Sequence, residues 1–214
     1  MLDIHDYNGQ LALKAAGLYE PFRGIIHEGG EASRVVDPHG KVLLDHPDDG
    51  SARRPEVPRG ELRRILLESL PDGTVQWGRK LGAVRPLGDG EHVLTFADGS
   101  IVNAGFVVGA DGAWSRVRSL LSDAKPAYAG ASIIETYLLD ADARHPATAR
   151  MVGGGALYAL VPGKCVVAHR EAMFARSATA GVEAAKTFKI CFDDDNAPYG
   201  LLDLFSGGAA VPPS

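Results

Sequence analysis

A carboxylate and a glycine stand side by side in the segment 107–118, where the chain must change direction. The apolar run 106–110 predicts a short strand buried on both faces. Asp111 follows this strand directly, and Gly112 permits a tight turn into a helix expected over 114–121. In open α/β sheets, ligands bind beyond the carboxyl ends of strands, where a carboxylate can accept hydrogen bonds from ribose-type hydroxyls. The alternative is that Asp-Gly is only a turn.

Three arginines lie on a helix predicted over 58–70. Pro58 suits the first turn of this helix, and apolar residues at helical spacing give it one buried face. Arg59 and Arg63 are four residues apart and therefore share a flank beside that face. Guanidinium groups held in this way can bind phosphate. The alternative is that Arg59, Arg63 and Arg64 form a solvated surface.

The segment 107–118 resembles the Gly-x-Asp-Gly-x-x-Ser-x-Val-Arg fingerprint of class A FAD-dependent monooxygenases, the group that contains para-hydroxybenzoate hydroxylase. The matching residues are Gly109, Asp111, Gly112, Ser115, Val117 and Arg118. In that family the segment lies by the pyrophosphate and ribityl chain of the flavin, and it is linked to use of the nicotinamide cofactor. The resemblance therefore implies that Asp111 helps to bind FAD, with NAD(P)H as the reductant.

Two further segments resemble the same family, and most closely its tetracycline-inactivating monooxygenases with their fungal and bacterial relatives. The segment 59–67 resembles the family's Arg-x-x-Leu-x-x-x-Leu helix, in which the arginine at the position of Arg63 reaches the flavin. Residues 2–5 followed by 8–10 resemble the segment in which an aspartate, here Asp3, approaches the flavin. The resemblance implies that both residues bind the cofactor. Taken alone, Asp3 is a terminal surface acid.

The sequence also departs from the family. The family opens with a strand and a Gly-x-Gly-x-x-Gly loop, whose glycines let the backbone approach the pyrophosphate. No such loop occurs among the 214 residues, and no strand-glycine-helix arrangement surrounds the glycines 153–155. The family's later Gly-Asp motif is missing too. We therefore expect a chain truncated at both ends, in which Met1 is an internal methionine of a longer reading frame.

These observations predict an α/β fold in three parts. Residues 1–126 form a partial FAD/NAD(P)-binding Rossmann-like domain that lacks the first βα glycine loop, residues 127–192 form part of a β-sheet substrate domain, and residues 193–214 form an irregular tail. The other elements expected are a helix over 8–18, strands at 35–36, 42–44 and 74–77, a hairpin over 92–96 and 100–104, and strands over 132–139, 156–161 and 165–169.

Composition excludes several classes of protein. The formal charge of −5 leaves no basic face for nucleic acid. No apolar run approaches the length of a membrane span, and no His or Cys spacing indicates a metal. Cys165 and Cys191 are far apart in sequence, which favours thiols in a reducing compartment, although a disulfide stays open. The first residues do not resemble a secretory signal, so we expect a cytoplasmic protein.

The full-length parent is therefore expected to be an FAD-dependent, NAD(P)H-using monooxygenase that hydroxylates an aromatic or polycyclic small molecule. No residue identifies itself as a catalytic acid or base. One alternative is a non-catalytic remnant or partner-binding fragment, which the missing glycine loop favours. Another is an FAD-dependent reductase or halogenase that shares the sheet. Loss of the first strand would expose an edge of strand 106–110, so we expect a dimer or partner to cover it.

Overall fold

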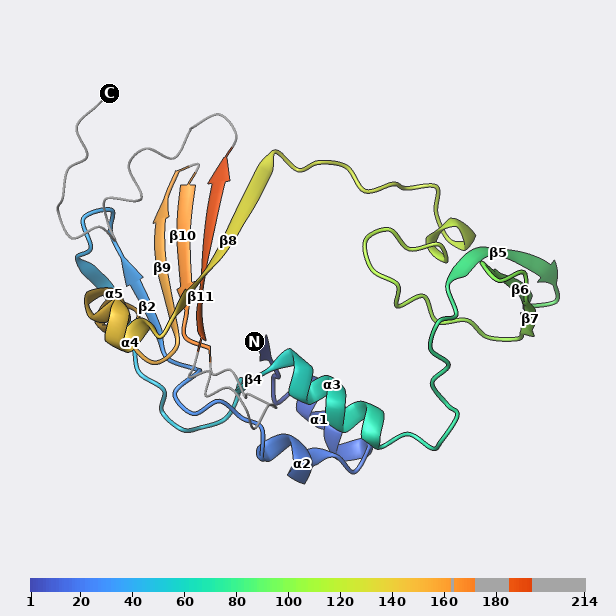
Figure 1. Cartoon of the computed structure of the whole chain (residues 1–214), viewed down its shortest axis with the longest axis horizontal. Coiled ribbons are helices and arrows are strands. Elements are labelled where there is room, and N and C mark those ends of the chain that lie inside the picture. The colour runs from blue at the N-terminus through green and yellow to red at the C-terminus, as the bar shows by residue number, and fades with distance from the viewer. Residues whose placement is uncertain (163, 172–184, 194–214) are drawn as a thin grey trace. The chain divides into compact units, whose positions relative to one another are not determined.

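The computed structural model divides into two compact units (Figure 1). It describes residues 1–162, 164–171 and 185–193. Unit 1 comprises Met1–Ser69 and Gly130–Ser214, and unit 2 comprises Leu70–Ala129. Unit 1 combines helices with a sheet, whereas unit 2 is built on three strands. The predicted mixed α/β fold class is confirmed.

The largest sheet belongs to unit 1 and has the strand order β3-β2-β9-β10-β11-β8. Its strands are β2 (Ser33–Val36), β3 (Val42–His46), β8 (Ala131–Leu139), β9 (Ala156–Val161), β10 (Lys164–His169) and β11 (Ala185–Asp193). Neighbours are antiparallel except β2 and β9, which are parallel. Every strand predicted in this part of the chain is confirmed to within a residue or two; β11 was not predicted.

The sheet takes strands from both sides of residue 127, because β2 pairs with β9. The predicted division into a domain over 1–126 and a domain over 127–192 stays a prediction. The expected irregular tail lies outside the described residues, apart from Asp193 at the end of β11. No helix in the described part of the chain is both long and apolar enough to cross a membrane.

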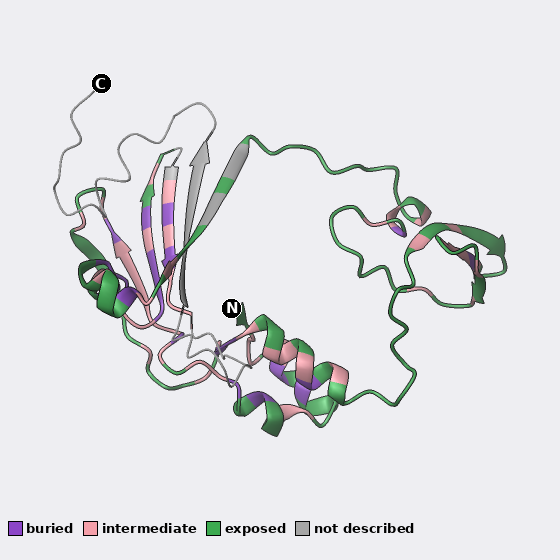
Figure 2. Cartoon of the chain, in the orientation of Figure 1, coloured by how far each residue is buried: buried purple, intermediate pink, exposed green. Residues whose placement is uncertain are grey.

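Two short helices, α4 (Ala141–Arg144) and α5 (Pro146–Val152), accompany the sheet. Val152 of α5 packs into a core with alternate residues of β9, Leu157 and Ala159. The remaining members of this core are Val36, Val166 and Ala168. Figure 2 shows buried positions along β9 and β10. The alternation is that of strands with one buried face, and Leu160 on the other face is 56% exposed.

The rest of unit 1 is a helical cluster closed by a two-stranded ribbon, β1 (Leu2–Asp3) with β4 (Glu56–Val57). The helices are α1 (Gly9–Ala15), α2 (Tyr19–Arg23) and α3 (Arg59–Glu68). Phe22 and Val57 are fully buried between them, with Leu13, Ile25 and Ile65. The helices predicted over 8–18 and 58–70 are confirmed as α1 and α3.

The ends of these helices follow their sequence signals closely. Asn8 caps α1, because its side chain accepts a hydrogen bond from the N–H of Gly9. Gly17, just after α1, has a φ of +70°, a left-handed conformation that suits glycine at a helix end. Pro58, predicted in the first turn of this helix, stands at the N-cap of α3.

Unit 2 contains the sheet β5-β6-β7, formed by β5 (Leu81–Gly88), β6 (Glu91–Phe96) and β7 (Ile101–Ala104). The hairpin of β6 and β7 was predicted and is confirmed. The strand predicted over 74–77 is wrong, because these residues form turns and irregular backbone. The sheet instead begins at β5, which contains Pro86. An edge strand tolerates proline because one side of its backbone needs no ladder partner.

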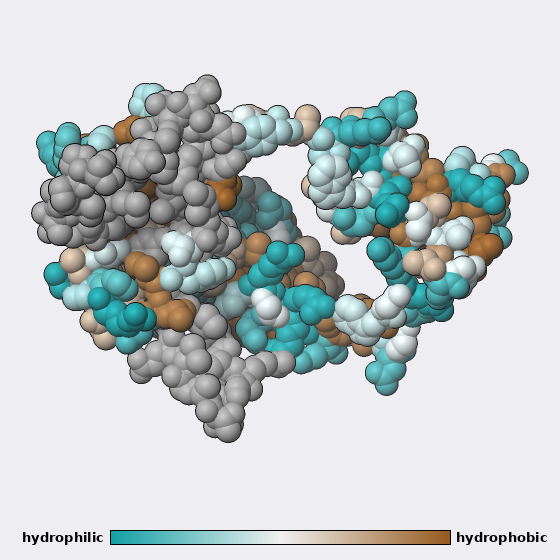
Figure 3. All heavy atoms as spheres, turned by 45° about the horizontal axis from the view of Figure 1, so that its top comes forward, coloured by the Kyte–Doolittle hydropathy of each residue, from teal (hydrophilic) through white to brown (hydrophobic). Residues whose placement is uncertain are grey.

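Two predictions around the Asp-Gly segment are also wrong. Residues 106–110 form no strand, and Phe106 and Val108 are 83% and 73% exposed. The helix expected over 114–121 is reduced to a single 3-10 turn, Arg118–Leu120. A strand buried on both faces needs a ladder partner on each side, and none of the described strands pairs with 106–110. Figure 3 shows hydrophobic side chains at the surface of unit 2.

Candidate functional site

Asp111 is the first residue of a hydrogen-bonded turn in unit 2. Its Oδ2 accepts a hydrogen bond of 2.7 Å from the N–H of Arg116, and the N–H of Ser115 donates to the carbonyl of Gly112 over 3.1 Å. Gly112 has a φ of +79°, which explains why glycine stands there. The Ser115 hydroxyl and the Arg116 N–H lower the pKa of the Asp111 carboxyl. Asp111 is therefore an exposed, ionised group with a fixed direction.

The other residues of the fingerprint close the same turn. A side chain on Gly109 would place its Cβ 2.8 Å from the Cβ of Val117, and Val117 is buried against this glycine. Ser115 Oγ accepts from the N–H of Arg118 over 3.1 Å, and Arg118 Nη2 lies 3.5 Å from the carbonyl oxygen of Gly112. The spacing of the fingerprint thus has a local physical basis, whatever the turn binds.

A pocket of about 340 Å³ opens beside this turn within unit 2. Arg118 and Lys125 contribute cationic side chains to its wall, and Trp114 contributes an indole that is 80% exposed. Cations beside an aromatic surface suit a ligand that combines phosphate with a planar ring. This chemistry fits part of a flavin or nicotinamide dinucleotide. Among the described residues, no group of three or more His, Cys, Asp or Glu side chains could hold a metal ion.

Asp3 lies on the β1–β4 ribbon of unit 1, opposite Glu56. Its Oδ2 is 3.3 Å from Nη1 of Arg54, and its side chain is 40% exposed. Backbone hydrogen bonds continue the ribbon, from the N–H of Ile4 to the carbonyl of Pro55 over 3.0 Å. The structure therefore holds Asp3 on paired backbone with an arginine beside it. Whether it contacts a flavin stays a prediction.

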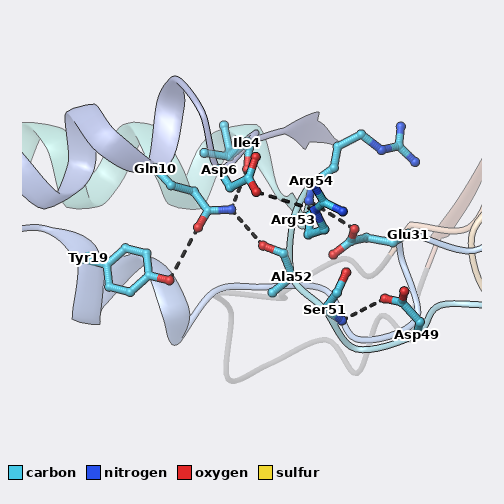
Figure 4. Close-up of polar contacts among 10 residues, drawn as sticks. All are labelled: Ile4, Asp6, Gln10, Tyr19, Glu31, Asp49, Ser51, Ala52, Arg53 and Arg54. Atoms are coloured by element: carbon cyan, nitrogen blue, oxygen red, sulfur yellow. Dashed lines mark hydrogen bonds and ion pairs between the residues drawn. The ribbon is translucent and has the colours of Figure 1, made fainter.

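Gln10 anchors the ribbon from α1, and the sequence did not single it out. Gln10 is 3% exposed. Its Nε2 donates to the carbonyls of Ile4 and Ala52 over 3.0 and 2.8 Å, and its Oε1 accepts from the Tyr19 hydroxyl over 3.4 Å (Figure 4). The same figure shows Arg53 beside Asp6, with their side chains 3.6 Å apart. The Asn-Gly-Gln string was noted only as a resemblance, because burial of a glutamine has no local signal.

Arg63 is an exposed residue of α3, the helix that begins immediately after β4 and Pro58. Its neighbour Arg64 is held by two ion pairs, to Glu61 at 2.9 Å and to Glu68 at 2.7 Å. In unit 1, β4 pairs with β1, which carries Asp3, and is followed along the chain by α3, which carries Arg63. Asp111 belongs to unit 2. The cofactor roles of all three residues stay predictions.

Two sequence relatives match most of the chain. No protein-family model matches it. It is 34% identical over 181 residues to the monooxygenase asqM of Emericella nidulans, and 35% identical over 177 residues to the monooxygenase penA of Penicillium thymicola. Each match covers 79% of this chain and 40% of the relative. A shorter match, 41% identical over 75 residues, is to 6-hydroxynicotinate 3-monooxygenase of Pseudomonas fluorescens, and covers 35% of this chain and 19% of that protein.

Solved structures share the fold at low sequence identity. The match to FqzB covers 98% of this chain and 47% of FqzB, with a TM-score of 0.68 and 17% identity. The match to an FAD-containing monooxygenase from Photorhabdus luminescens covers 92% of this chain and 53% of that protein, with a TM-score of 0.67 and 21% identity. The match to the tetracycline destructase Tet(51) covers 92% of this chain and 48% of that protein, with a TM-score of 0.54 and 18% identity. The chain therefore has a mixed α/β fold, and it matches about half of the length of FAD monooxygenase structures.

Proposed function

We propose that this chain is part of an FAD-dependent monooxygenase, an oxidoreductase that inserts one oxygen atom into an aromatic or polycyclic substrate and uses NAD(P)H as its reductant. The observation that carries the proposal is the 34–35% identity to two monooxygenases over 79% of the chain. The fold and the fingerprint turn around Asp111 support it independently. Because the chain spans 40% of those relatives, the activity is proposed for the whole protein.

In this proposal the chain's own residues bind and orient the cofactor, while FAD supplies the redox chemistry when bound. The ionised Asp111 accepts hydrogen bonds from hydroxyl groups of the cofactor, and Arg118 and Lys125 meet its phosphates. Asp3 and Arg63 are the further residues proposed to contact the flavin. Arg63 is suited to this role because its guanidinium stands on the rigid helix α3. None of these residues is assigned as a catalytic acid or base.

The substrate class rests on the names of relatives. One is a 6-hydroxynicotinate 3-monooxygenase, and another is a 3-amino-4-hydroxybenzoate 2-monooxygenase from Streptomyces platensis. The substrates of these two relatives, 6-hydroxynicotinate and 3-amino-4-hydroxybenzoate, are small aromatic acids. The narrower assignment, to the tetracycline-inactivating monooxygenases, has the support of the structural match to Tet(51). Higher TM-scores are found for the FAD-containing monooxygenase from Photorhabdus luminescens, at 0.67, and for a 2,6-dihydroxypyridine-3-hydroxylase, at 0.65. We therefore favour an aromatic substrate without choosing its number of rings.

A partner surface follows from the same proposal. The run 106–110 is apolar and exposed, with Phe106 and Val108 projecting into solvent. We propose that further protein covers it, either a second copy of the chain or another polypeptide. The exposed run and the 40% coverage of the relatives also favour the alternative of a non-catalytic or partner-binding fragment.

Two proteins test the proposal. The chain 1–214 should lose FAD on gel filtration and leave NADPH unoxidised, because no Gly-x-Gly-x-x-Gly loop is present to receive the pyrophosphate. The longest reading frame that contains the chain in its source genome should instead purify with a flavin spectrum and oxidise NADPH faster when an aromatic acid is added. If the protein encoded by this longest reading frame binds no FAD, the monooxygenase proposal is overturned. A yellow, NADPH-oxidising chain 1–214 would refute the need for the loop.

A further inference from the structure

Unit 1 contains a buried carboxylate that none of the proposed cofactor contacts uses. Glu56 is 5% exposed, although glutamate is among the residues least often buried. Its Oε2 lies 2.5 Å from Nε2 of His169, and the side chains of this pair are 7% and 19% exposed. Both atoms are buried, and neither makes a well-aligned hydrogen bond with the described residues. The same is true of Nδ1 of His169. The contact is therefore an ion pair whenever His169 carries a proton.

The pair joins two parts of unit 1 that are distant in sequence. Glu56 belongs to β4, lies opposite Asp3 in the ribbon, and is followed within three residues by the start of α3. His169 is the last residue of β10, in the middle of the six-stranded sheet. The loop after α2 completes the group, because the N–H of His27 donates to the carbonyl of Glu56 over 2.8 Å.

We propose that Glu56 and His169, with His27 beside them, form a proton-dependent latch that ties the sheet to the β1–β4 ribbon and positions Asp3 and α3. A buried ion pair adds little stability compared with apolar side chains of similar size, but the loss of one partner is costly. Such a pair therefore favours one arrangement of the elements over others. Glu56 and His169 act as positioning residues. That Asp3 and α3 face a cofactor rests on the proposed function; the latch itself does not.

The surroundings of His27 make the latch sensitive to acid. Burial lowers the pKa of His27 most strongly; the charge of Glu56 opposes this shift. His169 and Arg170 lower the same pKa further, whereas Glu171 raises it. His27 is therefore neutral in the folded protein at neutral pH. Arg170 is itself paired with the carboxylate of Asp142 at 2.6 Å.

Acidification then changes the partners of Glu56. In the unfolded chain His27 takes up a proton near its ordinary value of about 6.5, whereas in the folded chain it does so only at lower pH. Stability consequently falls as the pH drops through this window, and it levels off once both forms are protonated. A protonated His27 also competes with His169 for the single carboxylate of Glu56. Protonation of His27 therefore weakens the latch.

A double-mutant cycle on the chain 1–214 measures the pair directly. Urea unfolding, followed by far-UV circular dichroism, is recorded for the parent, Glu56→Gln, His169→Asn and the double variant. We expect coupling of about tenfold in the unfolding equilibrium constant at pH 7, because both side chains are largely removed from water. The matched control is the surface pair of Arg64 and Glu68, with about twofold coupling or less. Coupling of the buried pair no larger than this control would overturn the latch.

Histidine NMR gives a second measurement that does not depend on stability. The imidazole carbon resonances of His27 in the parent chain should titrate below the ordinary range, and Glu56→Gln should move this titration lower still, since the charge of Glu56 raises the pKa of His27. Glu68→Gln, the control on α3, should leave it in place. If Glu56→Gln fails to fold, the parent titration still decides, because an ordinary pKa for His27 would refute the acid sensitivity.

The cofactor-dependent part has its own experiment. In a longer reading frame that binds FAD, Glu56→Gln should raise the FAD dissociation constant at least fivefold and weaken its pH dependence, whereas Glu68→Gln should leave it unchanged. If the cycle and the titration succeed but no frame binds FAD, the proposed function fails and the latch stands. If FAD binds and Glu56→Gln does not alter its affinity, the latch does not position the cofactor site.

Discussion

Replacement of Gln10 by methionine should loosen the ribbon that carries Asp3. Methionine has a similar length and fills the same space, but it has no amide. The carbonyls of Ile4 and Ala52 would each lose a donor, at 3.0 and 2.8 Å in the present structure. An unsatisfied buried polar group costs about 1–3 kcal/mol. Both residues are only partly buried, so we expect a combined loss of about 2–4 kcal/mol from the free energy of unfolding.

The positions of the tryptophans let the two units be followed separately. Trp77 and Trp114 both belong to unit 2, so fluorescence reports on that unit, whereas far-UV circular dichroism also follows the helices of unit 1. In Gln10→Met, the urea midpoint by circular dichroism should fall while the fluorescence midpoint stays constant. The amide of Ile4, bonded to Pro55, should exchange its hydrogen faster.

The control for this substitution is Gln76→Met, at an exposed position of unit 2. It should change stability by less than about 0.5 kcal/mol, as surface substitutions usually do. If Gln10→Met loses no more than this control, and the amide of Ile4 remains protected, then water replaces the lost donors. The argument that Gln10 anchors the ribbon would be refuted.

Three further predictions concern the proposed cofactor contacts. In a frame that binds FAD, Arg63→Ala should weaken FAD affinity about 10- to 150-fold, equivalent to about 1.5–3 kcal/mol, or slow flavin reduction; if titration and stopped-flow show neither effect, Arg63 is a surface charge. Asp111→Ala should impair flavin binding or reduction more than it lowers the melting temperature of the apo-protein; the reverse order would make Asp111 a structural turn residue. Gly109→Ala should cost about 1–3 kcal/mol in the fluorescence-detected unfolding of unit 2, because the new Cβ would meet Val117 at 2.8 Å, and an unchanged midpoint would contradict this packing.

Local signals in the sequence were sufficient for several elements. Asn8 and the alanine-rich stretch after it determine α1, and the turn Ala97-Asp98-Gly99 determines the hairpin of β6 and β7. Gly99 indeed has a φ of +82°, and Asp98 Oδ1 accepts from the N–H of Ser100 over 2.9 Å. Such signals act within a few residues, so they do not depend on what else the chain packs against.

The apolar runs show where local signals stop. Residues 106–110 have the composition of a buried strand, yet they are largely exposed, and no strand in the described ranges pairs with them. Composition indicates that a segment tends to be buried, but a strand is stable only beside a partner whose position the segment does not encode. The strand predicted over 74–77 failed for the same reason. The sequence could therefore indicate the fingerprint at Asp111 but not the backbone before it.

The sequence by itself determined the local turns, the helix caps and the residue types of the candidate cofactor contacts, because each depends on neighbours along the chain. The tertiary structure alone decided which distant residues meet. It placed β2 beside β9, turned Gln10 toward the ribbon, and set Glu56 against His169. Burial removes such polar groups from water and makes their partners matter, and burial is a property of the packed chain rather than of any segment in it.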